Sequence, residues 1–260
     1  MSRTSRLWLR TGLTLLVAVV AVGNLTSAPA MAASGRSLEL QGIYPLGAQP
    51  YGRSWGEWTA SWWQWAMSMP ISANPLMETA DCTASQSGPV WFLGGSFVNA
   101  TVTRDCTIPA GKAILFPVLN VECSTVEPPP FFGENEAELR ACVASMMDAT
   151  ADYFAFIDGQ PVENLENYRL QSPLFSFSAP ADNVLFVPGP VSGESVSDGV
   201  WLLLTPMSAG NHTIRFGGTF TGFGLTLDVT YNITVLPGGR GRGQIAGDIE
   251  TWGTLKQLYR

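Results

Sequence analysis

Hydrophobic and polar residues alternate near the C-terminal end of the chain. Across residues 225–236 the apolar positions are Leu227, Val229, Tyr231, Ile233 and Val235, and the polar positions are Asp228, Thr230, Asn232 and Thr234. This period of two predicts a β-strand with one buried face and one face in water.

Eight further runs, bounded by Gly, Pro, Asn or Asp, have the composition of short strands. They are residues 90–93, 97–102, 113–116, 153–157, 174–177, 183–187, 200–204 and 210–216, with a turn at Asp158 and Gly159. So many short strands with turn residues between them predict a mainly β fold of the α+β class. We expect a β-sandwich, with a jelly roll as one candidate form.

Residues 54–70 follow a helical period instead. Four tryptophans repeat at the spacing of one helix face, namely Trp55, Trp58, Trp62 and Trp65. Ser54 and Glu57 have the spacing of a capping box, and Pro70 ends the pattern. We therefore predict a Trp-rich helix at the N-terminal side of the domain, with this indole face buried against the sheets.

Trp63 lies beside that face, about 80° around the helix from Trp55. A flat, partly exposed indole is a good platform for the face of a sugar ring. Trp63 is therefore the candidate ligand-binding residue.

A second helix is predicted over residues 136–149, with Asn135 and Glu138 as its capping pair. The neighbouring acids Glu134 and Glu136 suit the positive end of the helix dipole. We interpret this acidic cluster as helix-end chemistry rather than catalysis.

The N-terminus has the three parts of a signal peptide: basic residues, an apolar run at 13–22, and small residues at Ala30 and Ala32. We expect cleavage after Ala32, with an uncleaved membrane anchor as the alternative. The predicted organisation is a signal peptide at 1–32, a polar extension at 33–50, one β-rich domain at 51–236, and a flexible Gly- and Arg-containing tail at 237–260. No membrane span is expected after cleavage.

The chain contains four cysteines, Cys82, Cys106, Cys123 and Cys142, and all of them follow the predicted cleavage site. An even number in an exported chain indicates disulfides. Three pairings are possible, and we favour Cys82–Cys106 with Cys123–Cys142.

Removal of residues 1–32 takes away three of the 14 basic residues and none of the 21 acids, which leaves a net charge of 11 − 21 = −10. This charge argues against nucleic-acid partners.

The sequence contains few signatures of catalysis. The single histidine, His212, opens a predicted strand, and no nucleophile motif or phosphate loop accompanies it. With the cysteines paired, we expect no metal and no cofactor. Carboxylate chemistry remains, and its candidates are Asp105, Glu122 and Asp228. Asn99, Asn211 and Asn232 begin glycosylation sequons.

Several segments resemble a family of exported bacterial proteins that has no known activity. They are Tyr51-Gly-Arg-Ser-Trp-Gly-Glu-Trp, Trp62-Trp63-Gln-Trp65-Ala, Gln86-Ser-Gly-Pro-Val-Trp-Phe-Leu-Gly, Cys106-Thr-Ile-Pro-Ala-Gly-Lys and Gly210-Asn-His-Thr-Ile-Arg-Phe. The resemblance implies bacterial export to the periplasm, cell envelope or medium, and it assigns no catalytic residue.

These observations lead us to expect a non-catalytic binding or envelope-associated protein. Carbohydrate is the candidate ligand, and another envelope protein is a candidate partner. Two alternatives stay open: a carboxylate-dependent enzyme that degrades polysaccharides, and a purely structural or interaction module.

Overall fold

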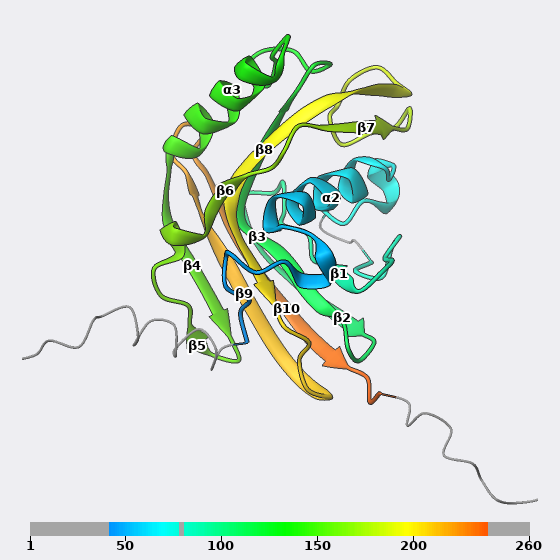
Figure 1. The fold of residues 1–260 in the computed structure, drawn as a ribbon, viewed down its shortest axis with the longest axis vertical. Coiled ribbons are helices and arrows are strands. Elements are labelled where there is room, and N and C mark those ends of the chain that lie inside the picture. Colours follow the sequence, from blue (N-terminus) through cyan, green and yellow to red (C-terminus); the bar gives the residue numbers. More distant parts are fainter. Residues whose placement is uncertain (1–41, 78–80, 239–260) are drawn as a thin grey trace, which may run out of the picture.

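The computed structural model describes residues 42–77 and 81–238, which form two five-stranded sheets and two α-helices (Figure 1). The first sheet has the order β1-β3-β8-β6, and β7 also pairs with β8. Its strands are β1 (Val90–Phe92), β3 (Ala113–Ser124), β6 (Arg169–Gln171), β7 (Phe175–Ala179) and β8 (Val191–Leu204).

The second sheet has the order β2-β10-β9-β4-β5. Its strands are β2 (Thr101–Ile108), β4 (Thr150–Ile157), β5 (Gln160–Pro161), β9 (Gly210–Phe220) and β10 (Leu225–Val235). The predicted mainly β sandwich is confirmed. Each sheet also contains one parallel pair, β1 with β3 and β2 with β10, whereas a jelly roll is antiparallel throughout.

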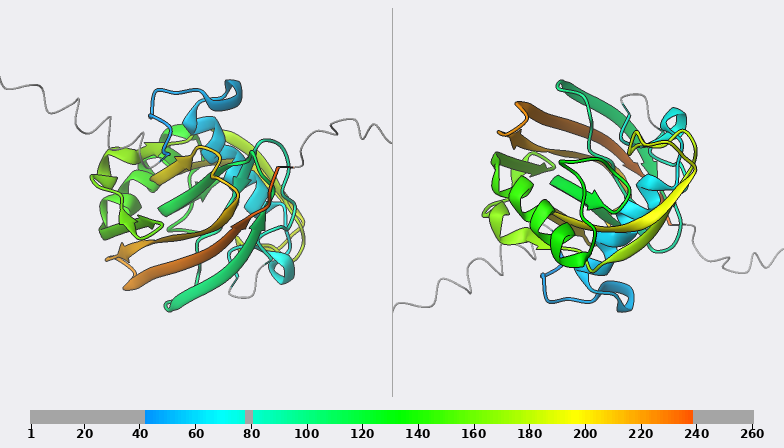
Figure 2. Two further views of the ribbon diagram at one scale, coloured as in Figure 1. Left: turned by 90° about the horizontal axis from the view of Figure 1, so that it is seen from below. Right: turned by 90° about the horizontal axis from the view of Figure 1, so that it is seen from above.

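The central strands of the first sheet are covered on both faces. Residues 113–119 of β3 and 195–204 of β8 are buried without alternation, as expected for strands with no wet face. On one face Phe116 contacts Phe216 of the second sheet, with 4.8 Å between ring centroids. On the other face Trp201 meets Trp62 of helix α2 (Trp55–Met67), with 5.4 Å between centroids. The first sheet therefore lies between α2 and the second sheet (Figures 1 and 2).

Helix α2 begins as the sequence predicts. The Glu57 amide donates to the Ser54 hydroxyl, and the Ser54 amide donates to the Glu57 carboxylate at 2.7 Å, which completes the capping box. The predicted burial of its main indole face is also confirmed. The expected partial exposure of Trp63 is wrong: this side chain is only 5% exposed, because it packs edge-on against Trp62 and faces the interior of a pocket.

Helix α3 (Glu136–Asp148) confirms the second predicted helix. At the N-terminus of the helix, the side chain of Asn135 accepts a hydrogen bond from the Glu138 amide. Both predicted disulfides are also present: Cys82–Cys106 attaches the segment after α2 to β2, and Cys123–Cys142 attaches β3 to α3. Two disulfides are typical of proteins from an oxidising compartment.

The strand predicted over residues 97–102 begins too early, and the strand predicted over residues 183–187 is wrong. Residues 97–100 lie before β2, which begins only at Thr101. Residues 183–187 form a turn-rich loop, in which the Asn183 amide group donates to the carbonyls of Pro180 and Val187. A side chain that satisfies the backbone of its own loop in this way competes with strand pairing.

Short 3-10 helices complete the fold: η1 (Pro50–Gly52), η2 (Ile71–Ala73) and η3 (Leu165–Tyr168). Part of the expected polar extension joins the folded unit, because Ile43 is buried and bridges Leu204. The predicted signal peptide, and the tail from residue 239 onward, lie outside the described residues. Within 42–77 and 81–238, no helix has the length and apolar character to span a bilayer.

The burial of α2 gives a first prediction. Trp62 is fully buried, and its indole N–H donates to the Leu93 carbonyl at 2.9 Å. Trp62→Ala should lower the free energy of unfolding by about 3–5 kcal/mol, the usual cost of truncating a core aromatic. Urea denaturation measures the change, with the half-exposed Leu46→Ala as the control that should change little. A loss for Trp62→Ala no larger than that of the control would contradict this account of the core.

Candidate functional site

A pocket of about 410 Å³ lies between α2, the end of β3, the 183–187 loop and one end of the second sheet. On the edge of β3 that faces away from β8, β1 pairs only with residues 113–115, and the next pairing is the isolated bridge between Ser124 and Phe132, so that the edge is free between these points. Most of the pocket walls are apolar, and they come from segments far apart in the sequence: Trp62, Trp63, Leu76, Phe97, Val121, Pro128, Phe131, Val184, Leu185, Phe186, Phe220, Phe223, Leu225 and Leu227.

Two glutamates lie in this apolar lining. Glu122 projects from β3 and is 4% exposed, and Glu127 belongs to the loop that follows the strand. Their carboxyl groups hydrogen-bond to each other. Ser195 donates to Glu122 at 2.7 Å, and Ser124 donates to Glu127 at 2.8 Å.

A hydrogen bond between two carboxyl groups requires a proton on one of them. Burial raises the pKa of Glu122 well above its ordinary value, and the neighbouring charge of Glu127 raises it further. Burial also raises the pKa of Glu127, although the hydrogen bonds from Glu122 and Ser124 oppose this. Of the two carboxyl groups, that of Glu122 has its pKa raised further, so that it keeps its proton to a higher pH than Glu127.

Trp63 is distinguished by its unused hydrogen-bond donor. The other four indoles of α2 each donate to a backbone carbonyl at 2.9–3.0 Å: Trp55 to Pro45, Trp58 to Pro50, Trp62 to Leu93 and Trp65 to Ala84. The buried Nε1 of Trp63 has no partner, and neither has Nδ2 of Asn120, which also lines the pocket. Buried donors without acceptors are costly, and such groups in a pocket are available to a ligand.

The mouth of the pocket has an aromatic rim. Phe97, Phe186 and Phe223 are 42%, 70% and 53% exposed, and the rings of Phe97 and Phe186 lie 6.4 Å apart. Phe186 also has a positive φ of 55°, a conformation that bulky residues rarely adopt. Backbone strain of this kind is common at ligand sites, where the surrounding structure maintains it.

Only one of the three carboxylates proposed from the sequence lies in this pocket. Glu122 does, whereas Asp105 accepts a hydrogen bond from Asn232 at 2.9 Å and Asp228 pairs with Arg215 at 2.8 Å, both on the solvent-facing side of the second sheet. Sequence reasoning missed Glu127, Asn120 and the phenylalanine rim. One signal was available for Glu122, since it is a charge within the apolar run that continues past residue 116 to Cys123.

A second polar cluster has the composition of a catalytic triad. His212 Nδ1 lies 2.8 Å from Asp158 Oδ2, and His212 Nε2 lies 3.4 Å from Ser208 Oγ. However, Nε2 is closer to the Ser208 carbonyl oxygen, at 3.0 Å, which can only accept a hydrogen bond. A triad requires Nε2 to accept the serine proton, so that this geometry describes a structural histidine at the start of a strand.

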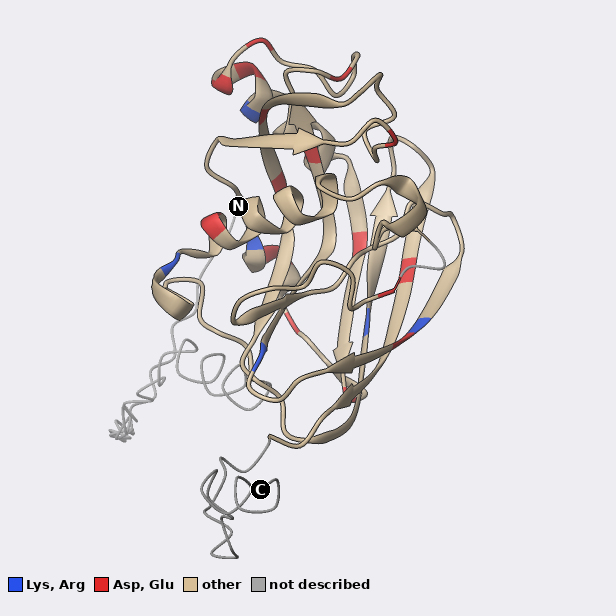
Figure 3. Ribbon diagram, turned by 90° about the vertical axis from the view of Figure 1, so that its right-hand side faces the viewer, with Lys and Arg blue, Asp and Glu red and all other residues tan. Residues whose placement is uncertain are grey.

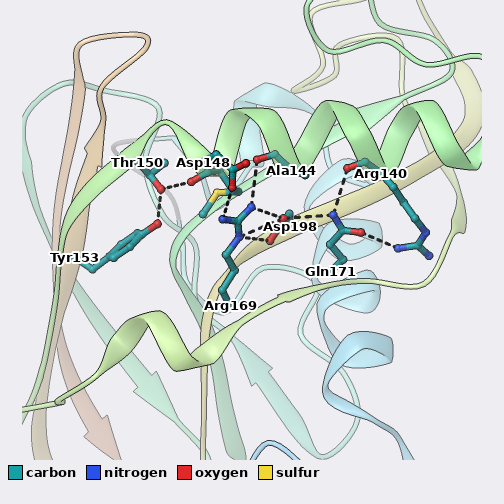
Figure 4. A network of polar contacts seen from close by, with 9 residues as sticks. Arg140, Ala144, Asp148, Thr150, Tyr153, Arg169, Gln171 and Asp198 are labelled. Carbon is teal, nitrogen blue, oxygen red and sulfur yellow. Dashed lines mark hydrogen bonds and ion pairs between the residues drawn. The ribbon is translucent and has the colours of Figure 1, made fainter.

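A third polar cluster attaches α3 to the first sheet (Figure 4). The Arg169 guanidinium lies 2.9 Å from the buried carboxylate of Asp198 and 2.7 Å from Asp148, and it also donates to the Ala144 carbonyl. The hydrogen bond to Asp198 raises the pKa of Arg169 above its ordinary value. Because the charges of this cluster are paired with one another, we assign it to stability. Elsewhere on the ribbon, Lys and Arg positions are few and scattered (Figure 3).

Comparison with known proteins adds little. No protein-family model matches the chain, and a search of curated proteins finds no match. Among solved structures, a chain in "Structure of PbICP-C in complex with falcipain-2" matches at 15% identity and a TM-score of 0.21, over 58% of this chain and 99% of that one. "Solution Structure of Amebosin" matches at 12% identity and a TM-score of 0.15, over 52% of this chain and 96% of that one. Likenesses this weak do not bear on function.

The unpartnered indole of Trp63 gives a second prediction. Trp63→Phe removes a donor that makes no bond, whereas the matched change Trp65→Phe breaks the hydrogen bond to the Ala84 carbonyl. Trp65→Phe should therefore lower the free energy of unfolding by about 1 kcal/mol more than Trp63→Phe. Equal losses in urea denaturation would show that Trp63 has an acceptor in solution.

His212 gives a third prediction. Burial lowers its pKa, but the hydrogen bonds to Asp158 and to the Ser208 carbonyl outweigh this effect, and the net pKa is raised. A pKa that is higher in the folded state stabilises the fold at pH below the unfolded value and loses this effect as the pH rises through the folded value. His212→Ala should therefore be more destabilising at about pH 5 than at about pH 8.

Urea denaturation of the His212 variant at the two pH values measures this difference. In the background of Asp158→Asn, which removes the charge partner, the pH dependence of the His212→Ala effect should shrink. A pH-independent effect in the wild-type background would contradict the assigned pair.

Proposed function

We propose that this chain is a binding protein that holds a small, largely apolar molecule in the pocket beside β3. The observation that supports this most directly is the pocket itself, which has apolar walls and opens through an exposed aromatic rim. Its volume of about 410 Å³ lies in the usual range for small-molecule sites, which are mostly apolar with a few convergent polar groups.

The rim favours binding over a purely structural role. Phe97, Phe186 and Phe223 expose apolar area to water at the place where the pocket opens. Clustered exposed aromatics are unfavourable in isolation and commonly mark binding sites. The hydrogen bonds of Asn183 hold the loop that presents Phe186, so that the pocket is pre-formed.

A carbohydrate ligand has less support from this geometry. Each buried sugar hydroxyl needs a hydrogen-bond partner. The lining offers few polar side chains, namely Ser96, Asn120, Glu122 and Glu127, together with the indole N–H of Trp63. Trp63 is also an enclosed wall rather than an open platform, since it is 5% exposed. We therefore retain Trp63 as a ligand-binding residue and propose an apolar ligand for it.

The alternative of a polysaccharide-degrading enzyme also has less support. Glycosidases hold their two carboxyl groups about 5–10 Å apart, so that the sugar, or the sugar and a water molecule, fits between them. The carboxyl groups of Glu122 and Glu127 instead form a hydrogen bond with each other. This arrangement leaves no room for a glycosidic carbon between the two groups.

We also propose that the protein functions outside the cytoplasm, in the periplasm, the cell envelope or the medium. The N-terminal residues 1–32 have the pattern of an export signal, and the two disulfides suit an oxidising compartment.

Binding of a neutral apolar fluorophore tests the proposed function. N-phenylnaphthylamine, which becomes bright in apolar surroundings, should bind the mature protein and be displaced by other apolar compounds. Phe186→Ala should weaken binding by about tenfold, because it removes apolar area at the mouth without opening a core cavity. The matched control is Phe132→Ala, since Phe132 is 39% exposed and does not line the pocket.

Two results would contradict the proposed function. If wild type fails to bind the fluorophore, the pocket does not accept apolar ligands. If Phe132→Ala weakens binding as much as Phe186→Ala, the fluorophore binds elsewhere on the surface.

A further inference from the structure

The ionisable groups in the pocket lining are all acidic. Of the described residues that line it, only Glu122 and Glu127 are ionisable, and no Lys, Arg or His is among them. A ligand that enters the pocket therefore meets acidic groups, neutral polar groups and aromatic walls.

The charge of Glu127 has no basic partner within the part of the chain that the structure describes. The described cations are all engaged elsewhere. Arg140, Arg169 and Arg215 form ion pairs, Arg53 and Arg104 donate to other backbone and side-chain oxygens, and Lys112 donates to the Gly88 carbonyl. The groups that contact Glu127 are the carboxyl group of Glu122 and the hydroxyl group of Ser124. The partly buried carboxyl group of Glu127 thus has no cationic partner among the described residues.

We propose that the natural ligand is a lipophilic amine, whose apolar body fills the aromatic pocket and whose protonated nitrogen donates to the carboxylate of Glu127. This inference rests on the proposed binding function and assigns its substrate class. A cation is attracted both by a carboxylate and by the electron-rich faces of aromatic rings. The lining contains such rings beside the acidic pair, among them Trp62, Trp63 and Phe131.

The balance of charge supports a single positive charge on the ligand. When the two carboxyl groups share one proton, one negative charge remains, and one ammonium group neutralises it. An anionic ligand would instead bring two negative charges together in a site of low dielectric. The other pocket-lining side chains on α2 and β9, Trp62, Trp63 and Phe220, and that of Ser195 on β8 are all neutral, so that no other charged group opposes this preference.

The preference should depend on pH through Glu127. The groups that face it are the carboxyl group of Glu122 and the hydroxyl group of Ser124. Since burial raises the pKa of Glu127, amine affinity should decline as the pH is lowered, and it should begin to do so above the pH at which an exposed glutamate takes up its proton.

Three probes with one aromatic skeleton test the inference: naphthylmethylamine, naphthylmethanol and naphthoate, which are cationic, neutral and anionic at neutral pH. Isothermal titration of the mature protein should show the amine binding at least about tenfold more tightly than the alcohol, the size expected of a charge-assisted hydrogen bond. The anion should bind most weakly. This comparison uses wild type alone and does not depend on the folding of any variant.

Glu127→Gln then tests whether the preference for the amine over the alcohol comes from Glu127. This nearly isosteric change removes the charge, and the amine should lose its advantage over the alcohol while the alcohol still binds. The control is Glu163→Gln, which removes the same charge at an exposed position outside the pocket lining. It should leave the ratio of the two affinities unchanged.

The outcomes separate the two proposals. Equal binding of amine and alcohol by wild type, or an amine preference that survives in folded Glu127→Gln, would overturn the lipophilic-amine assignment and leave the apolar pocket in place. Failure of all three probes to bind would overturn both.

Discussion

Five indole side chains on one helix must be kept from water, and much of the structure is arranged around this constraint. Helix α2 cannot stand alone, because its tryptophans bury a large apolar area only against a matching surface. The first sheet provides that surface: β3 and β8 are apolar on both faces, and Trp201 meets Trp62 at the centre of the contact. Backbone carbonyls of the surrounding loops accept four of the five indole N–H groups, which fixes the position of those loops as well.

The same arrangement creates the pocket. Helix α2 and the second sheet lie on opposite faces of the first sheet, and β1 is too short to fill the free edge of β3 between them. Several locally unfavourable features gather in this space. They are a buried pair of carboxyl groups, two buried donors without acceptors, an exposed aromatic rim and a strained backbone at Phe186. Natural proteins often depart from local rules at functional sites. Single departures occur elsewhere in the described residues, such as the unpartnered indole N–H groups of Trp91 and Trp201, but the pocket combines several kinds.

The other polar clusters have the opposite character. Arg169 is surrounded by the acceptors that its guanidinium needs, and the two ring nitrogens of His212 lie within hydrogen-bond distance of a carboxylate and of a carbonyl. Groups that are fully paired within the protein have little capacity left for a ligand. Satisfaction of hydrogen bonds thus distinguishes the clusters that stabilise the fold from the pocket that we propose to be functional.

The sequence by itself determined the local features of this protein. Period-two alternation located β10, the capping residues Ser54 and Asn135 located the starts of both helices, and the number and spacing of the cysteines indicated the two disulfides. Each of these depends on residues that are near in the chain, or on a small number of possible pairings. The prediction of a strand over residues 183–187 was wrong because the hydrogen bonds of Asn183 outweigh the strand-like composition of this segment.

The functional site was decided only by the tertiary structure. Whether Trp63 is exposed depends on what covers the flank of α2, and whether Glu122 is an ordinary acid depends on Glu127 and Ser195, which lie on a loop and on another strand. Periodicity records which face of an element is apolar, but not which elements meet there. The pocket lies beside β3, where no described segment pairs with the free edge of the strand. Its size and position depend on how strands that are distant in the sequence pair with one another.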